Sequence, residues 1–371
     1  LLLVEGGYLT IKTKAGELVP LILNAVQKRL MVLIRLRMSQ RKPVRIWVLK
    51  ARQTGTSTLC EAIGYAMTSQ HEATNSLVMA DDIDGANYLF GMQKLFQETL
   101  AEHLRPVPKH SNEKKLEFAN IHSQVLIDTS DNLAAGRKFT FRVVHLSEAS
   151  RFRDLRTLML GINQSVPNLP GTIVIGETTA NGLNQFYDEW TATEDAQKNG
   201  LTDWECFFIP WFEVEEYRLA LTGGVMYPVE AIEFATTTDR ENFLVDERLL
   251  KDRYGLSDEQ INWRRWCIVN NCNRNVLQFN QEFPDCPKTA FVSTGDNFFD
   301  KSALGRQEAV KPIAIGNIVK ENGKYVWREI STGLFKIYQF PQRNSQYVVA
   351  ADPAEGLEHG DKSASVVLDK K

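Results

Sequence analysis

Short apolar runs of strand length alternate with longer stretches of helical periodicity over the first half of the chain. The alternation predicts helices at 21–38, 57–69 and 85–104 and strands at 45–50, 76–80, 124–127, 141–146 and 172–176. Strands interleaved with helices favour a parallel sheet that has helices on both faces. We therefore predict a doubly wound, mainly parallel α/β domain.

The pattern changes after about residue 211. Helices rich in charged and aromatic residues are predicted through 230–268, with no buried strand among them, as in a lid or linker. A new β pattern then gives a turn at 331–333 and strands at 325–330, 334–340, 347–352 and 363–369. Because 371 residues exceed one ordinary domain, we expect an α/β domain over 1–250, a helical linker or lid over 251–300 and a second domain that starts at 301–371.

The composition is that of a globular protein. Hydrophobic residues make up 43% of the chain and charged residues 24%, and no apolar run is long enough to cross a bilayer. The five cysteines are too scattered for a disulfide framework, which favours a reducing cytosol. The chain starts at Leu1 and lacks the pattern of a signal peptide, so we expect it to begin inside a longer gene product.

The net charge of −3 conceals a basic stretch between residues 19 and 60, which holds no Asp or Glu. Two interpretations stay open: a solvated helix face, or a basic surface that binds phosphates. The basic residues of this stretch are Lys28, Arg29, Arg35, Arg37, Arg41, Lys42, Arg45, Lys50 and Arg52.

A candidate phosphate-binding loop lies where the strand at 45–50 turns into the helix at 57–69. Backbone N–H groups and a helix N-terminus face an anion at such a turn. Against the pattern GxxxxGK[ST], the segment keeps Gly55 and Ser57 but has Lys50 for the first Gly and Thr56 for the Lys. An ordinary strand-to-helix turn without a ligand is the alternative. The candidate nucleotide-binding residues here are Lys50, Gln53, Thr54, Gly55, Thr56, Ser57 and Thr58.

The strand at 141–146 delivers Ser147 and then Glu148 to its carboxyl end, the edge at which ligands bind in open α/β sheets. Hydrolysis of ATP needs a hydroxyl or carboxylate for magnesium and a polar side chain that orients the attacking water. Ser57 and Ser147 fit the first need and Glu148 fits the second. A strand that ends in an ordinary exposed glutamate is the alternative.

Two further segments fit a nucleotide site. The strand at 172–176 runs into small polar residues, among them Thr178 and Thr179, which are able to sense a γ-phosphate. An ordinary loop explains this run equally well. Upstream, the amide of Gln27 is able both to donate to and to accept from an adenine edge, although an exposed helical glutamine has the same sequence signature.

Taken in order, these segments resemble the large terminase subunit of tailed bacteriophages. The helix with Asn24 and Gln27 is similar to that family's adenine-contacting segment, and residues 51–57 are similar to its deviant Walker A motif. Residues 145–148 resemble its Walker B motif and residues 176–182 its coupling motif.

The resemblance continues into the part of the family that cuts DNA. The similar segments are 280–284 with 290–291, at the entrance to the nuclease, and 350–353 with 360–363, its first strand and turn. The chain departs from the family at Thr56, which occupies the usual lysine position, and at Ser147, which occupies the usual aspartate position. Arg52 or Lys50 is expected to supply the missing charge.

The resemblance implies a P-loop ATPase, a helical linker or lid and the start of an RNase H-like nuclease. Its implied activity is ATP hydrolysis that drives double-stranded DNA into a procapsid. Glu148 and Arg52 would be catalytic, Ser57 and Ser147 would hold magnesium, and Thr178 and Thr179 would couple hydrolysis to movement.

Asp352 and Asp361 would hold Mg²⁺ or Mn²⁺ in the nuclease. Two-metal cleavage needs several carboxylates on different strands, so we expect cleavage only from a longer chain. The implied partners are double-stranded DNA, the portal protein, a small terminase subunit and further copies of the chain in a ring. The implied location is the host cytoplasm, docked on the procapsid portal.

Two other functions remain open. A cellular helicase or DNA translocase shares the same core but needs a second motor domain. A nucleotide-binding scaffold without turnover would account for Thr56 in the loop.

Overall fold

The computed structural model describes residues 1–112, 114–134, 139–292, 310–321, 323–331, 333–343, 345–352 and 364–369. The chain divides into two compact units, Leu1–Gly305 and Arg306–Lys371. The expected turn at 360–363 and residue Asp361 lie outside the described residues.

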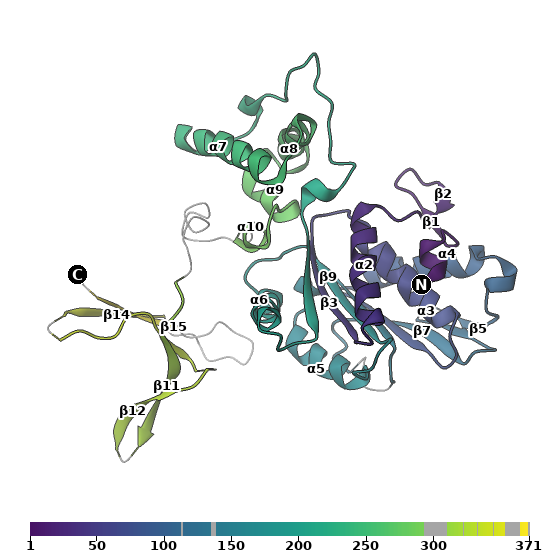
Figure 1. Ribbon diagram of the computed structural model, residues 1–371, viewed down its shortest axis with the longest axis horizontal. Helices are drawn as coiled ribbons and strands as arrows, with labels where there is room; N and C mark the ends of the chain where they lie inside the picture. The colour runs from purple at the N-terminus through teal and green to yellow at the C-terminus, as the bar shows by residue number, and fades with distance from the viewer. Residues whose placement is uncertain are drawn as a thin grey trace. The chain divides into compact units, whose positions relative to one another are not determined.

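An eight-stranded sheet forms the centre of the first unit (Figure 1). Its order is β10 (Trp204–Ile209), β3 (Val44–Lys50), β9 (Ile173–Thr178), β8 (Val143–Ser147), β4 (Asn75–Ala80), β7 (Ser123–Thr129), β6 (Lys115–Phe118) and β5 (Pro108–Ser111). The first six strands are parallel, and β6 and β5 add to β7 as an antiparallel edge. The predicted mainly parallel sheet is confirmed, whereas β10, β6 and β5 were not predicted.

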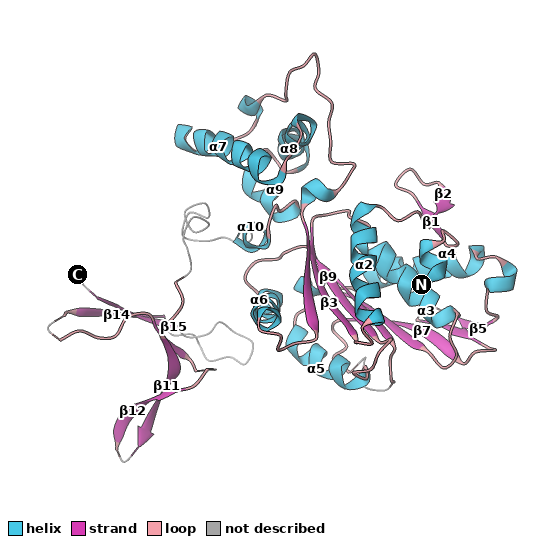
Figure 2. Ribbon diagram, viewed as in Figure 1, coloured by secondary structure: helices cyan, strands magenta, loops and turns pink. Residues whose placement is uncertain are grey.

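Helices cover both faces of this sheet (Figure 2). Alternate residues of β3 divide between the two cores: Ile46 and Val48 pack with α2 (Ala25–Ser39), α3 (Thr56–Ser69) and α4 (Ile83–Thr99). Trp47 and Leu49 pack on the other face with α5 (Leu155–Ser165) and α6 (Gln185–Lys198). Since every residue of β3 is buried, its end is shielded from water on two sides.

Gly176 allows the Trp47 ring to lie against β9. A Cβ atom at this position would lie 2.1 Å from the ring of Trp47. The Trp47 ring also stacks on Trp204 at 4.5 Å and meets Phe186 edge-on at 5.5 Å. The glycine is therefore required for the close approach of this ring to the sheet.

A helical region follows the sheet within the same unit. It contains α7 (Thr237–Tyr254), α8 (Asp258–Asn271), α9 (Val276–Glu282) and α10 (Pro287–Val292), with short 3₁₀ turns at Trp211–Glu213 and Val229–Ala231. Its core stacks Trp211 on Trp263 and Trp263 on Tyr217, with ring centroids 5.4 and 4.1 Å apart. Residues 230–268 were predicted as helical, and α7 and α8 confirm this.

Short elements complete the first unit. They are α1 (Leu2–Glu5), a hairpin of β1 (Thr10–Lys12) and β2 (Leu18–Pro20), and 3₁₀ turns at Glu102–Leu104 and Ala149–Arg151. No helix among the described residues is long and apolar enough to cross a membrane.

The second unit is built of antiparallel strands. One sheet has β11 (Ala314–Glu321) between β12 (Lys324–Glu329) and β13 (Phe335–Ile337), and β14 (Tyr347–Asp352) pairs with β15 (Ala364–Asp369). The predicted strands are present, and β11 is an addition. Every residue of β14 is exposed, so the described residues do not bury the apolar side chains of this strand.

Candidate nucleotide site at the carboxyl edge of the sheet

The carboxyl ends of β3, β9 and β8 bring together residues from three distant segments. Ser147 of β8 lies opposite Glu177 of β9, and Leu49 of β3 lies opposite Thr178 of β9. Because parallel strands end at one edge, Lys50, Ser147 and Glu177 meet there.

Glu177 is at the centre of this arrangement and is fully buried. One oxygen, Oε1, accepts hydrogen bonds from Ser57 Oγ at 2.7 Å and from Ser147 Oγ at 2.9 Å. The other, Oε2, forms an ion pair with Lys50 Nζ at 2.9 Å. Burial disfavours the carboxylate, but the charge of Lys50 and the neighbouring His145 ring lower the pKa of Glu177 well below its usual range. The sequence analysis gave Glu177 no chemical role, although a single charged residue in an otherwise uncharged buried strand is a signal of a functional residue.

Lys50 is also buried and lies between two carboxylates. Its Nζ is 2.9 Å from Glu177 Oε2 and 3.4 Å from Glu148 Oε1. Burial disfavours the ammonium, but the charges of Glu177 and Glu148 outweigh this effect and raise the pKa of Lys50. A permanent positive charge therefore lies at the end of β3.

Glu148 connects this cation with the polar residues that follow β9. Its backbone is left-handed, with φ 56°. This conformation is uncommon for a side-chain-bearing residue and is often found at functional sites. Its Oε2 accepts from Thr178 Oγ1 at 3.3 Å and from the backbone N–H of Thr179 at 3.4 Å. The hydroxyl oxygens of Thr178 and Ser150 lie 2.7 Å apart, so the two threonines, Ser150 and Glu148 belong to one polar cluster.

The predicted phosphate loop ends at Gly55, the left-handed N-cap of α3 with φ 77°. Thr56 begins the helix, and its hydroxyl lies 2.7 Å from that of Thr54, directed into the protein. Ser57 is the second helical residue and already contacts Glu177. The N-terminus of a 14-residue helix therefore opens at the three strand ends, as an anion site requires.

Side chains from the start of α2 hold the loop in place. Asn24 Nδ2 donates to the Thr54 carbonyl at 3.1 Å, and Gln27 Nε2 donates to the Gly55 carbonyl at 2.8 Å. Gln27 Oε1 accepts from the backbone N–H of Asn24, which completes the cap of α2. Both polar atoms of the Gln27 amide are thus engaged within the protein. Gln53, with φ 54°, and the partly buried Thr58 complete the predicted set.

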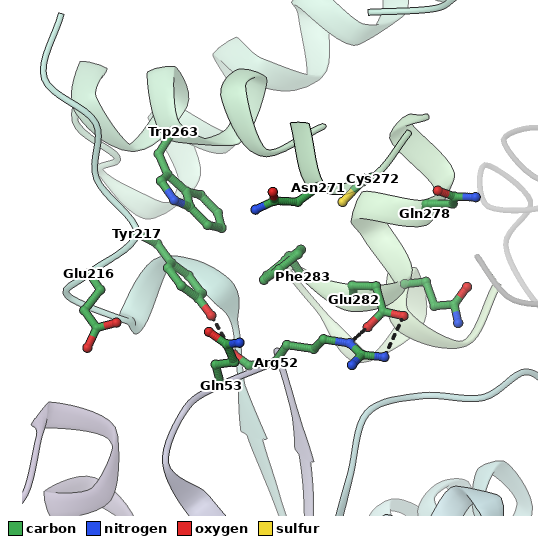
Figure 3. Close-up of a pocket in the computed structure, with 11 residues that line it drawn as sticks. Arg52, Gln53, Glu216, Tyr217, Trp263, Asn271, Cys272, Gln278, Glu282 and Phe283 are labelled. Carbon is green, nitrogen blue, oxygen red and sulfur yellow. Dashed lines mark hydrogen bonds and ion pairs between the residues drawn. The ribbon is translucent and has the colours of Figure 1, made fainter. Parts of the chain in front are cut away.

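Arg52 forms its ion pair with a carboxylate of the helical region. Its guanidinium pairs with Glu282 of α9, with Nη2 3.2 Å from Oε1, and this hydrogen bond raises the pKa of Arg52 (Figure 3). The Arg52 carbonyl accepts from the Tyr217 hydroxyl at 2.7 Å. Arg52 therefore joins the loop to the helical region, and Lys50 is the cation that lies beside Glu148.

A cavity of about 690 Å³ lies beside this part of the loop (Figure 3). Aromatic rings, side-chain amides and two carboxylates line it together with Arg52. The lining residues are Arg52, Gln53, Glu216, Tyr217, Trp263, Asn271, Cys272, Gln278, Gln281, Glu282 and Phe283.

About half of the basic residues in the stretch at 19–60 form ion pairs. Arg29 pairs with Glu213, Arg35 with Glu5, and Arg37 with Asp203 and Glu205, in addition to the pairs of Lys50 and Arg52. Arg45 is buried and donates to backbone carbonyls and to Thr172. Five of the nine basic residues thus have carboxylate partners, and the choice between a solvated helix face and a phosphate-binding surface stays open for the stretch as a whole.

His145 and Glu61 lie directly behind the site and were not predicted. His145 Nδ1 is 2.6 Å from Glu61 Oε1, and Nε2 is 3.5 Å from Glu177 Oε1. Burial alone would lower the pKa of His145, but the neighbouring Cys60 and the two carboxylates raise it well above its usual value. Glu61 in α3 and His145 in β8 are each an ionisable residue among apolar neighbours, and this is the sequence signal that could have identified the pair.

Oxygen atoms suitable for magnesium are present at the site. The hydroxyls of Ser57 and Ser147 converge on the Glu177 carboxylate, and hard cations of this kind prefer oxygen ligands. Asp352, predicted for a separate metal site, is the exposed last residue of β14. Among the described residues, no group of three or more His, Cys, Asp or Glu side chains is placed to hold a metal ion.

Solved structures share the fold around this site, whereas no protein-family model and no curated protein matches the sequence. The HK97 bacteriophage large terminase superposes with a TM-score of 0.50 and 14% identity, covering 85% of this chain and 61% of its own. The chain has the fold of a phage large terminase.

Other terminases are also structural neighbours. The ATPase domain of the Thermus phage P74-26 large terminase has a TM-score of 0.40 and 18% identity, over 53% of this chain and 86% of its own. The large terminase of a thermophilic bacteriophage, in complex with ADP, has a TM-score of 0.38 and 10% identity, over 50% of this chain and 45% of its own. This chain thus spans about three fifths of the HK97 terminase and less than half of the terminase that was solved with ADP.

Proposed function

We propose that the chain is the ATP-hydrolysing motor of a viral DNA-packaging terminase. The observation that carries the proposal is the buried Lys50 at the end of β3, beside Glu148 and a left-handed glycine that opens a helix. A strand, an anion-binding turn and a carboxylate next to a cation are the parts that phosphoryl transfer requires. The terminase fold accommodates this chemistry.

The loop residues 53–58 bind the phosphates through backbone N–H groups and the N-terminus of α3. Lys50 supplies the charge that Thr56 does not, because it already lies among the carboxylates of the site. The role of Arg52 toward the phosphates stays a prediction, since its guanidinium pairs with Glu282. Gln27 contributes by holding the carbonyl of Gly55. The neighbouring cavity, with its aromatic rings and amides, suits the base of the nucleotide.

Glu148 accepts a proton from the attacking water, since its carboxylate is partly exposed at the strand end. Ser57, Ser147 and Glu177 would hold Mg²⁺, which neutralises charge on the phosphates when it is bound. Thr178 and Thr179 contact Glu148 directly and would transmit loss of the γ-phosphate to the segment after β9.

The second unit is proposed to begin an RNase H-like nuclease. Asp352 at the end of β14 and Asp361 would contribute to its Mg²⁺ or Mn²⁺ site. The proposed partners are double-stranded DNA, a portal protein, a small terminase subunit and further copies in a ring. The proposed location is the host cytoplasm, at the procapsid portal.

A nucleotide-binding scaffold without turnover is the second candidate, which Thr56 at the usual lysine position favours. Steady-state ATP hydrolysis by the purified chain, with and without double-stranded DNA, separates the two. We expect turnover, and we expect Glu148→Gln to reduce it by orders of magnitude while nucleotide binding stays near normal. The exposed Glu241 provides a matched control, Glu241→Gln, which should leave turnover unchanged. Equal turnover in Glu148→Gln and the parent would reject the proposed role of Glu148, and no turnover in the parent would favour the scaffold.

A further inference from the structure

Three side chains from outside the phosphate loop each hold one of its backbone carbonyls. The three hydrogen bonds run from the Tyr217 hydroxyl to the Arg52 carbonyl at 2.7 Å, from Asn24 Nδ2 to the Thr54 carbonyl at 3.1 Å and from Gln27 Nε2 to the Gly55 carbonyl at 2.8 Å. Asn24 and Gln27 belong to the start of α2, whereas Tyr217 belongs to the core of the helical region. Two parts of the protein that are far apart in the sequence therefore fix the loop.

Each held carbonyl also fixes the direction of a backbone N–H group. A trans peptide unit is planar, so the C=O of one residue and the N–H of the next point in opposite directions. The three bonds therefore direct the N–H groups of Gln53, Gly55 and Thr56 away from the side chains that hold the carbonyls. Within the part of the chain that the structure describes, these three N–H groups have no protein acceptor. Free N–H groups that line a turn in this way bind anions.

The backbone of Gln53 shows why the loop needs such support. Its φ of 54° lies in the left-handed region, which a residue with a side chain keeps only where the surrounding structure determines it. Tyr217 holds the peptide unit before Gln53, and Asn24 holds the one after Thr54. The Tyr217 ring is fixed in turn, because it stacks on Trp263 with the centroids 4.1 Å and the planes 8° apart (Figure 3). The hydroxyl that holds the loop therefore has a rigid support.

We propose that Tyr217 is a positioning residue that, together with Asn24 and Gln27, directs the N–H groups of the loop toward the phosphates of the nucleotide. The inference rests on the proposed ATPase function, and it gives the helical region a part in phosphate binding. Because these bonds act on the phosphates and not on the base, they matter equally for a polyphosphate that carries no base. One hydrogen bond has a net value on the order of 10-fold in affinity.

The test measures the affinities of the purified chain for ADP and for inorganic tripolyphosphate by calorimetry, with Mg²⁺ present. Tyr217→Phe keeps the ring and its stacking on Trp263 and removes only the hydroxyl. We expect both affinities to weaken by a similar factor, on the order of 10-fold. KM for ATP should rise with a smaller change in kcat, because contacts made both before and during phosphoryl transfer mainly change binding. A tyrosine that only stabilised the fold would leave KM and both affinities unchanged in the folded protein.

A second variant and a matched control complete the test. Asn24→Ser still caps α2 but lacks the Nδ2 donor to the Thr54 carbonyl, so both affinities should weaken even if Tyr217→Phe does not fold. Tyr65→Phe is the control, because Tyr65 of α3 is also buried and its hydroxyl donates to Gln97 Oε1 at 2.8 Å. This control should lower the melting temperature and leave KM and both affinities unchanged.

The base-free ligand separates the possible outcomes. Parent-like affinity for tripolyphosphate in folded Tyr217→Phe, or in Asn24→Ser if Tyr217→Phe does not fold, would overturn the inference, even if the affinity for ADP fell. An equal loss of affinity in Tyr65→Phe would also overturn it. A parent chain that binds both ligands but does not hydrolyse ATP would reject the proposed motor, and the affinities of the variants would still decide the inference. A parent chain that binds neither ligand would reject both.

Discussion

Strands β9 and β14 each place a carboxylate at the end of an apolar run, but the two units surround it differently. Glu177 of β9 is fully buried and contacts a lysine and two hydroxyls. Asp352 of β14 is exposed, at the end of a two-stranded sheet in which every β14 residue is exposed. Glu177 has these partners because covering layers exclude water from it and neighbouring strands supply a cation and a hydroxyl.

The covering layers also make the interactions strong. Charges separated by a given distance interact several times more strongly in a protein interior than in water. The Lys50 ion pairs lie under helices on both faces of β3, whereas in the pair of Arg52 and Glu282 the side chains are 48% and 24% exposed. We therefore expect substitutions to change kcat/KM for ATP and the free energy of unfolding most where they remove a buried charge. Substitutions that disturb the packing over β9, or that remove a more exposed charge, should have smaller effects.

The largest effect is expected from Lys50→Met, which keeps the length of the side chain and removes its charge. Loss of the cation should lower kcat/KM for ATP on the order of 10³-fold, as for other cations that stabilise the phosphoryl transition state. Two carboxylates lose their partner, so the melting temperature should also fall. ATP kinetics and a thermal melt measure the two effects. Parent-like turnover in the folded variant would contradict the assignment of Lys50.

Gly176→Ala should disturb the layer that covers β9. The added methyl group would lie 2.1 Å from the rigid Trp47 ring, so we expect a loss of about 1–3 kcal/mol in the free energy of unfolding. Denaturant unfolding measures this loss. The control is Gly64→Ala in α3, where the nearest atom would lie 3.5 Å away and helix propensity improves. Equal stability of the two variants would show that Trp47 moves aside easily.

Arg52→Ala tests the exposed ion pair. Because Arg52 contacts Glu282 at the protein surface, we expect less than about 1 kcal/mol of lost stability and a change in kcat/KM well below that of Lys50→Met. The same assay and melt apply to both variants. If Arg52→Ala lowered kcat/KM as much as Lys50→Met, Arg52 would have the role toward the phosphates that the sequence predicted.

Asp352→Ala should have the smallest effect. Asp352 is an exposed carboxylate of the second unit and has no role in the chemistry proposed for the nucleotide site, so turnover should match the parent and stability should change by less than about 0.5 kcal/mol. ATP hydrolysis and unfolding are measured side by side. A strong loss of turnover would mean that the second unit acts on the motor.

The sequence predicted the central strands and helices within a few residues. Periodicity identified β3, β9 and α3, because a buried parallel strand is apolar throughout and an enclosed helix is apolar at its own spacing. The edge strands β5 and β6 escaped prediction because they are short and polar. Strand β10 escaped prediction although it pairs with β3 over its whole length.

The sequence also predicted several residues of the site. Gly55 was predicted as the glycine just before a helix, Ser57 as the hydroxyl in its first turn and Glu148 as the glutamate that follows an apolar strand. Each depends on a local backbone pattern that the sequence shows. The structure brings Ser57 and Ser147 onto one carboxylate and places Glu148 beside Lys50.

Only the tertiary structure decided which residues meet. Strand order places β3, β9 and β8 side by side, although they are far apart in the sequence, and it thereby makes Glu177 the common partner of Lys50, Ser57 and Ser147. Lys50 and Arg52 are two residues apart and equally basic, yet one is directed into the sheet edge and the other toward Glu282. Local sequence patterns determine which elements form and which of their faces are apolar. How deeply a polar side chain is buried, and which charges lie beside it, depend on segments that meet only after folding.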